Sequence, residues 1–390
     1  MTRHPHDVHG FGLVELLLAA VLTATVAGAV VALVDPSRGL FGTQPEQTDI
    51  QQRLRAATSA LADDLVRAGA GPALGPSAGP LLQAIAPIMP YRFAAQGGDP
   101  ARGIFHRHDT LTVVYVRAGA MQTTVRERVA DGAPAVTFDL PPWCADDTCG
   151  FAPGLRAAVF GAAGAWDTFT VAQAGAGRLS LDRPAGLIGR YAAGASLAAV
   201  VTRTYTLNAD PVTGRSRLVR DDGGGIDLPV VDDVVALGFA YLAEATPPRL
   251  VPDRQRPEAT YGPSPPAVGS DDPDDGWPAG ENCVFEVRDG RHASRLPALG
   301  AEASLVPLPP AMMTDGPWCP DAAHPHRFDA DLLRIRSVGV VLRTQAGPPM
   351  FRGQAGPLFL HAGAATSPAR WVPDQEIRFQ VSPPNLNLSR

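Results

Sequence analysis

The hydrophobic and polar positions divide the chain into a short polar leader, one long apolar segment and a mixed remainder. Residues 11–34 are apolar apart from Glu15 and two threonines. A helix over this segment would be about 36 Å long, enough to cross the hydrocarbon core of a bilayer. An ionised group inside such a segment costs on the order of a few kcal/mol unless it is neutralised or paired. We therefore expect Glu15 to have a partner.

A second helical pattern follows the apolar segment. Proline and glycine between Asp35 and Gly39 predict a kink or break, with the helix resuming by Glu46. Apolar residues then recur every three or four positions, which predicts an amphipathic helix of about twenty residues ending at Gly69. We expect its apolar stripe to pack on the protein's own sheet, with a partner-binding helix as the alternative. The stripe consists of Ile50, Leu54, Ala57, Leu61, Leu65 and Ala68.

The remainder of the chain has the pattern of strands and loops. Residues 71–105 are rich in Gly and Pro and are predicted to form a loop. Residues 246–282 are rich in Pro, Asp and Gly and predict an insertion or loop. Turn residues at 208–214 predict a hairpin between their flanking strands. β-branched and aromatic residues predict strands at 109–116, 135–140, 167–171, 197–207, 216–219, 230–242, 332–344 and 376–381.

These patterns predict an α+β fold in which a long N-terminal helix is laid on antiparallel sheet. The 390 residues are enough for one large or two ordinary domains. The formal net charge of −6 disfavours a general polyanion binder, so no direct nucleic-acid binding is expected. The sequence contains no lysine, and the only primary amine is therefore the chain terminus.

Gly10, Phe11 and Glu15 resemble the class III signal of type IV prepilins and type II secretion pseudopilins. In that family a prepilin peptidase cuts after the glycine, and the new N-terminal residue is N-methylated. The resemblance implies cleavage after Gly10, methylation of Phe11, and pairing of Glu15 with the N-terminal amine of a neighbouring subunit. Gly10 and Phe11 would be substrate positions for the peptidase rather than catalytic residues. The alternatives are an ordinary signal peptide cleaved near residues 27–29 and a plain single-span anchor.

Later segments extend this resemblance to a narrower group. Residues 49–55 and 63–69 are similar to the post-membrane helix of PilW-type minor pilins and their GspJ-type secretion relatives. Softer similarity to PilW-type proteins occurs at 205–207, 218–220, 234–241 and 381–387. The resemblance implies a leader at 1–10, a transmembrane and assembly helix at 11–34, a kink and amphipathic helix at 35–70, a β-rich pilin head at 71–245, an insertion at 246–330 and C-terminal strands of the head at 331–390.

The function implied by the resemblance is that of a non-enzymatic minor pilin at or near the tip of a type IV pilus-like filament. Its implied partners are other pilin subunits, the prepilin peptidase and the inner membrane, and no cofactor is expected. The implied location is the inner membrane with a periplasmic head, and then a cell-surface filament. The alternatives are a minor pseudopilin of type II secretion, a surface adhesin that binds through residues 246–330, and a membrane-tethered periplasmic enzyme such as a hydrolase.

Three motifs could carry chemistry, and each has a simpler interpretation. Residues 75–79 fit the G-x-S-x-G pattern of serine hydrolases but lack the flanking strand and helix, which favours a loop. Residues 271–276 could offer carboxylates to calcium, but Pro273 and Gly276 interrupt the alternating ligand pattern, which favours a solvated acidic loop. The histidine pairs at 106 and 108 and at 324 and 326 have no third ligand nearby, which favours surface histidines over a metal site.

Four cysteines lie outside the apolar segment: Cys144, Cys149, Cys283 and Cys319. An even set beyond a membrane anchor of this kind points to disulfides in an oxidising compartment. Three connectivities are possible, and the closeness of Cys144 to Cys149 favours their pairing. The absence of tight C-x-x-C pairs disfavours zinc.

Overall fold

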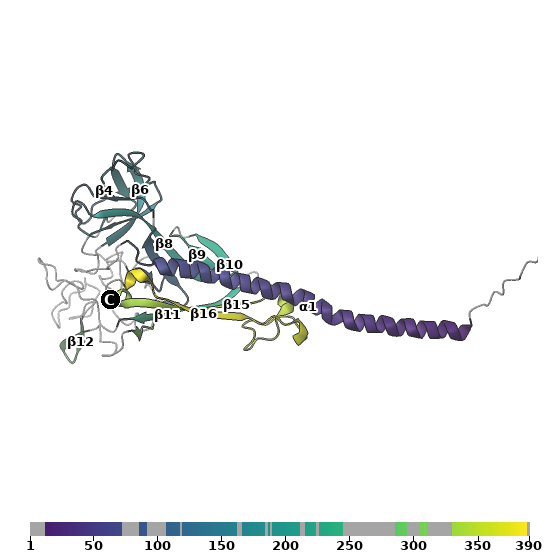
Figure 1. The fold of residues 1–390 in the computed structure, drawn as a ribbon. Coiled ribbons are helices and arrows are strands. Elements are labelled where there is room, and N and C mark those ends of the chain that lie inside the picture. Colours follow the sequence, from purple (N-terminus) through teal and green to yellow (C-terminus); the bar gives the residue numbers. More distant parts are fainter. Residues whose placement is uncertain are drawn as a thin grey trace, which may run out of the picture. The chain divides into compact units, whose positions relative to one another are not determined.

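The computed structural model describes residues 12–71, 86–91, 107–117, 119–161, 166–183, 186–187, 189–210, 215–223, 226–244, 285–294, 305–309 and 330–387. Within these residues the fold is α+β, with one long N-terminal α-helix and sheets that are mostly antiparallel (Figure 1). The expected fold class is therefore confirmed at this level. Gly10, Phe11, Cys283, Cys319, the G-x-S-x-G motif, the acidic run at 271–276 and three of the four paired histidines lie outside the described residues.

The N-terminal helix α1 spans Leu13–Arg67 without interruption. The break that the sequence allowed between Asp35 and Gly39 is absent, because the helix continues through Pro36. The kink, which was the other form of that prediction, stays a prediction. A proline within a helix removes one backbone hydrogen bond, while the turns on either side keep theirs. The helix ends as predicted near Gly69, whose positive φ of 76° suits a glycine at a helix C-terminus.

The chain divides into two compact units. One comprises Met1–Gln52 and Thr344–Gln375, and the other comprises Arg53–Arg343 and Glu376–Arg390. In the first unit, the backbone N–H of Gly347 donates to the Glu46 carboxylate at 2.7 Å. Residues 344–375, which the sequence assigned to the C-terminal part of the head, thus belong to the same unit as the N-terminal turns of α1.

The largest sheet lies in the second unit and is organised around one long strand. Strand β8 pairs antiparallel with β2 and β9 along its later part and with β3 and β5 along its first residues. The predicted hairpin at 208–214 is confirmed by the pairing of β8 with β9. The strands of this sheet are β1 (Ile88–Met89), β2 (Leu111–Val116), β3 (Gln122–Thr124), β4 (Ala135–Thr137), β5 (Arg156–Phe160), β6 (Trp166–Gly175), β7 (Arg178–Leu181), β8 (Ser196–Ala209), β9 (Ser216–Asp221) and β10 (Asp227–Asp232).

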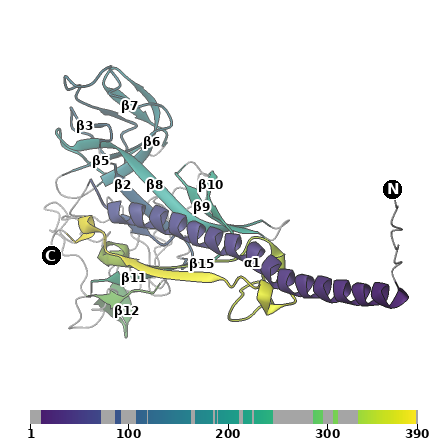
Figure 2. The same cartoon turned by 45° about the vertical axis from the view of Figure 1, so that its right-hand side comes forward.

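Strands β3 to β7 and the start of β8 form a lobe with its own hydrophobic core (Figures 1 and 2). Order along the sheet runs from β8 through β5, β6 and β7 to β4. Phe138 and Phe151 meet edge to face in this core, with ring centroids 5.7 Å apart. The core buries Val125, Val136, Phe138, Phe151, Val159, Phe169, Leu179 and Leu197, among others.

A second sheet has the order β14, β11, β15, β16, and a separate hairpin joins β12 to β13. The hairpin and β14 lie within the predicted insertion at 246–330, and β14 pairs with β11 of the head. Their bounds are β11 Val234–Ala243, β12 Phe285–Arg288, β13 Arg291–Ser294, β14 Val306–Pro307, β15 Ile335–Thr344 and β16 Gln375–Val381. The short 3-10 helices of the described residues are η3 (Ala330–Arg334), η4 (Pro349–Phe351), η5 (Pro368–Arg370) and η6 (Pro384–Leu386).

Two strand predictions differ from the structure. The apolar stretch at 230–242 forms two strands rather than one, because Asp233 adopts a positive φ of 58° between β10 and β11. That conformation is compatible with aspartate but not with continuous extended backbone. The stretch at 71–105 was predicted as loop, yet Ile88 and Met89 form β1 and pair with β2.

The six apolar residues of the predicted stripe on α1 are buried. Their neighbours on the other side of the helix are exposed, including Gln51, Arg55 and Asp63. Asp64 is also fully buried, although it is charged. The later turns of α1 therefore present one covered face and one solvated face.

Candidate functional site

The first turns of α1 form an apolar surface that the described protein leaves uncovered. Residues Leu13–Val30 have a mean hydropathy of 2.2, and none of their side chains is buried. By length and composition, this segment could cross a membrane. Water solvates such a surface poorly, so the segment points to an apolar environment or to partner helices.

The polar side chains within this segment find partners inside the helix itself. Glu15 accepts a hydrogen bond from the backbone N–H of Gly12 at 3.1 Å. Thr23 donates to the carbonyl of Ala19 at 2.7 Å, and Thr25 donates to the carbonyl one turn before it. A bilayer supplies no water to such groups, so internal pairing is what a spanning helix requires.

Glu15 occupies the third helical position, where its carboxylate reaches back to the residue that precedes the helix. This is the side-chain half of a capping box, and a negative charge is also favourable in the first turn of a helix. The charge-neutralising partner expected for Glu15 stays a prediction, because the Gly12 N–H is a neutral donor. Gly10 and Phe11, the predicted processing positions, lie outside the described residues.

Asp64 is a site residue that the sequence analysis missed. Its carboxylate accepts hydrogen bonds from Arg203 at 2.8 and 2.9 Å, from Tyr115 at 2.8 Å and from Tyr205. Tyr115 lies on β2 and the other two partners lie on β8. One buried carboxylate thus fastens helix α1 to two adjacent strands of the largest sheet.

Burial and the contact with Asp64 raise the pKa of the two tyrosines around it. Burial, the Asp64 charge and hydrogen bonding to it raise the pKa of Tyr205. Burial is also the first cause of a raised pKa at Tyr115, followed by its hydrogen bond to Asp64. Both hydroxyls therefore stay protonated and keep donating to the carboxylate far above neutral pH.

Two further buried aspartates have the same kind of surroundings. Asp233 interacts with Arg53 at 3.1 Å and with Arg215 at 3.2 Å. Asp167 accepts from the backbone N–H of Gly189 at 2.8 Å and from the Tyr191 hydroxyl at 3.1 Å. These carboxylates are occupied by cations and hydrogen-bond donors, which is typical of structural ion pairs rather than of a general base open to substrate.

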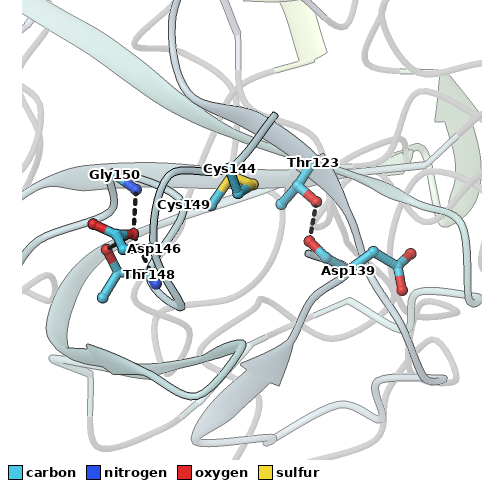
Figure 3. The surroundings of a disulfide bond; sticks show 7 residues. All are labelled: Thr123, Asp139, Cys144, Asp146, Thr148, Cys149 and Gly150. Carbon is cyan, nitrogen blue, oxygen red and sulfur yellow. Dashed lines mark hydrogen bonds between the residues drawn. A yellow bond between two sulfur atoms is a disulfide. The ribbon is translucent and has the colours of Figure 1, made fainter. Parts of the chain in front are cut away.

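Cys144 and Cys149 form a disulfide, as the sequence favoured (Figure 3). The loop that it closes is further fixed by Asp146, whose carboxylate accepts from the Thr148 backbone N–H at 3.0 Å and from its hydroxyl at 2.7 Å. The hydrogen bonds from Thr148 lower the pKa of Asp146 below its usual value. The pairing of Cys283 and Cys319 stays a prediction.

An open groove of about 500 Å³ lies beside this loop. The residues that line it include Gln122, Thr124, Asp139 and Trp143. Trp143 immediately precedes the disulfide, and its side chain is 62% exposed. Among the described residues, no three His, Cys, Asp or Glu side chains are placed to hold a metal ion.

No protein-family model matches this sequence, and no curated protein matches it.

Proposed function

We propose that the chain is a minor pilin of the PilW type, which is inserted in the inner membrane, cleaved after Gly10 and assembled into a type IV pilus or related filament. The observation that carries the proposal is the uncovered apolar helix Leu13–Val30, whose three polar side chains are satisfied internally. Such a helix is suited first to a bilayer and then to a bundle of similar helices. The resemblance of Gly10, Phe11 and Glu15 to the prepilin signal supports the same role.

Glu15 has two successive partners in this proposal. In the single chain its carboxylate caps the helix through Gly12. In the filament it accepts the methylated amine of Phe11 from a neighbouring subunit, and the two charges neutralise each other in an apolar bundle. An unpaired charge in the apolar bundle would raise the free energy of the filament, so a subunit that docks out of register is bound less stably.

The head is proposed to pack in a pilin-like way, with the amphipathic later turns of α1 laid on the sheet. The buried stripe and the Asp64 contacts to β2 and β8 support this arrangement. The head faces the periplasm before assembly and the cell surface afterwards. Its size favours a minor subunit at or near the tip, because a bulky head is hard to repeat densely along a fibre.

A non-enzymatic role is proposed with this assignment. The buried carboxylates among the described residues are Asp64, Asp167, Asp221 and Asp233. Asp64, Asp167 and Asp233 each have an arginine partner, and Asp221 accepts from the backbone N–H of Gly223 at 2.9 Å. The proposed partners are other pilin subunits, the prepilin peptidase and the inner membrane. A minor pseudopilin of type II secretion uses the same helix and the same glutamate, and is the alternative within this class.

The proposal is tested by replacing Glu15 with Gln, which removes the charge and keeps the size of the side chain. Because the amine of the neighbour then has no counter-charge, incorporation into filaments should fall by about tenfold or more, which corresponds to at least ~1.4 kcal/mol. The measurement is an immunoblot of sheared filaments, normalised to the membrane pool.

The control is Glu127→Gln, which removes a carboxylate that is exposed on the head. This variant should assemble like the unmodified chain. Equal incorporation of Glu15→Gln and Glu127→Gln would show that Glu15 does not guide assembly, and the proposed docking mechanism would be abandoned.

A further inference from the structure

The groove beside the disulfide has the size and composition of a small-ligand site. Its volume of about 500 Å³ falls within the usual range for ligand pockets. Its apolar lining includes Trp143 and Pro141. Its polar lining consists of Gln122, Thr123, Thr124 and Asp139, whose side chains carry an amide, hydroxyls and a carboxylate.

The backbone next to Trp143 is held in place, and the Trp143 side chain is largely exposed. The next residue, Cys144, is bonded to Cys149, and its backbone N–H donates to the Pro141 carbonyl at 2.9 Å. Asp147 ties the same loop to the turn after β6 by accepting from the backbone N–H of Ala176 at 2.7 Å. A fixed loop backbone does not have to be ordered when a ligand binds, which lowers the entropic cost of recognition.

Hydrogen bonds also fix the polar residues that line the groove. The Asp139 carboxylate accepts from the Thr124 hydroxyl at 2.6 Å, and the Thr123 hydroxyl donates to the Asp139 carbonyl at 2.6 Å (Figure 3 shows the second contact). Arg126 lies 3.6 Å from the other carboxylate oxygen and offsets its charge. The wall therefore offers donors and acceptors in set positions with little net charge.

This combination limits the chemistry of the ligand. The described residues that line the groove include no cationic side chain, which disfavours phosphates and other polyanions. The groove is open rather than enclosed, which disfavours a fatty chain. A ligand that matches both the apolar and the polar lining needs one flat apolar face to stack on an indole. It also needs hydroxyls around its edge to bind amide and carboxylate groups.

We infer that the groove binds a neutral oligosaccharide, with one sugar ring stacked on Trp143 and its hydroxyls hydrogen-bonded to Asp139 and Gln122. The inference gives the lobe a recognition function separate from assembly. It also places binding at residues 120–143 rather than in the region 246–330 that the sequence suggested for an adhesin. Because binding is measured on the single chain, its outcome is independent of whether the proposed filament forms.

The test uses the full chain, purified in a detergent without a sugar headgroup, on an array of neutral glycans. The best-bound trisaccharide is then titrated by calorimetry against the unmodified chain and three variants. Trp143→Ala should weaken binding by about tenfold or more, because the ligand loses the aromatic ring on which its sugar stacks. Trp143→Phe should restore part of the affinity.

Leu140→Ala is the matched control, because Leu140 is also exposed and lies close in sequence but does not line the groove. It should bind like the unmodified chain, and all variants should keep the same thermal midpoint. Absence of binding to any neutral glycan at millimolar concentration would overturn the inference. So would equal binding by Trp143→Ala, or Trp143-dependent binding of peptides from an array in place of glycans.

Discussion

Asp64 lies on the apolar stripe of α1, three residues after Leu61 and four before Ala68. A sequence signal for it therefore existed, because a carboxylate in phase with buried apolar residues must be paired to be buried. Its partners could not be predicted, since Arg203 and Tyr205 are more than a hundred residues away along the chain. The periodicity of a helix indicates which face is covered but not what covers it.

The raised pKa of Tyr205 predicts a loss of stability at alkaline pH. Its folded-state pKa lies above the unfolded value of about 10, so its contribution is complete below pH 10 and is lost as the pH rises beyond it. We expect the thermal midpoint of the full chain in detergent to fall between pH 9 and 11. Tyr205→Phe should be less stable at pH 7, but its midpoint should fall less steeply over that interval.

Other tyrosines whose pKa is raised by burial, such as Tyr191 and Tyr241, should keep part of the alkaline loss in the Tyr205→Phe variant. An unchanged slope in Tyr205→Phe would contradict the assignment of this titration to the Asp64 cluster.

At the scale of elements, helix α1 is fastened to β2 and β8 through Asp64. Removing the carboxylate would leave the Arg203 charge with no partner at the helix and the Tyr115 hydroxyl without its acceptor, while Tyr205 would keep only the Ala60 carbonyl at 3.1 Å. We expect Asp64→Ala to lower the free energy of unfolding by about 3–5 kcal/mol, as for other broken buried ion pairs. Denaturant unfolding of the full chain in detergent measures this change.

Asp63 provides the control, since it is adjacent in sequence and exposed. Asp63→Ala should change the free energy of unfolding by less than about 0.5 kcal/mol. If the two alanine variants unfolded at the same denaturant concentration, the contacts of Asp64 with β2 and β8 would not be the ones that hold the helix.

The sequence predicted best those elements that are marked by the composition of their own residues. Strands with many β-branched and aromatic residues, such as β2 and β8, lie close to their predicted ranges. The stretch at 230–242 failed because composition suggested one strand, while Asp233 turns the backbone and pairs with distant arginines. The helix does not break at Pro36, because the loss of one backbone hydrogen bond does not end a long helix.

At the scale of the whole molecule, the lobe of β3 to β7 could not be foreseen. Its strands β3 and β5 pair with the beginning of β8, which follows them in the chain by tens of residues. No local periodicity marks such pairings, so the sequence predicted strands at 135–140 and 167–171 within a β-rich head from 71 to 245 but not the lobe that they help to form. The groove could not be predicted for the same reason, although a tryptophan beside two closely spaced cysteines was a usable signal in the sequence.

The proposed subunit is anchored, processed and assembled through its N-terminus, so the chemistry of that terminus bears on the whole proposal. An apolar helix with a carboxylate in its first turn is common to a pilin and to a plain anchor, but only the pilin requires an amine at Phe11. The absence of lysine makes that amine the only primary amine in the chain before methylation. Its chemical state can therefore be read without interference from side chains.

The decisive measurement is the intact mass of the mature protein, with N-terminal peptide sequencing by mass spectrometry. We predict a chain that starts at Phe11 and carries one additional methyl group on its amine. A chain that starts at Val30, as cleavage by an ordinary signal peptidase would leave it, would contradict the proposal, and so would a chain that retains Gly10.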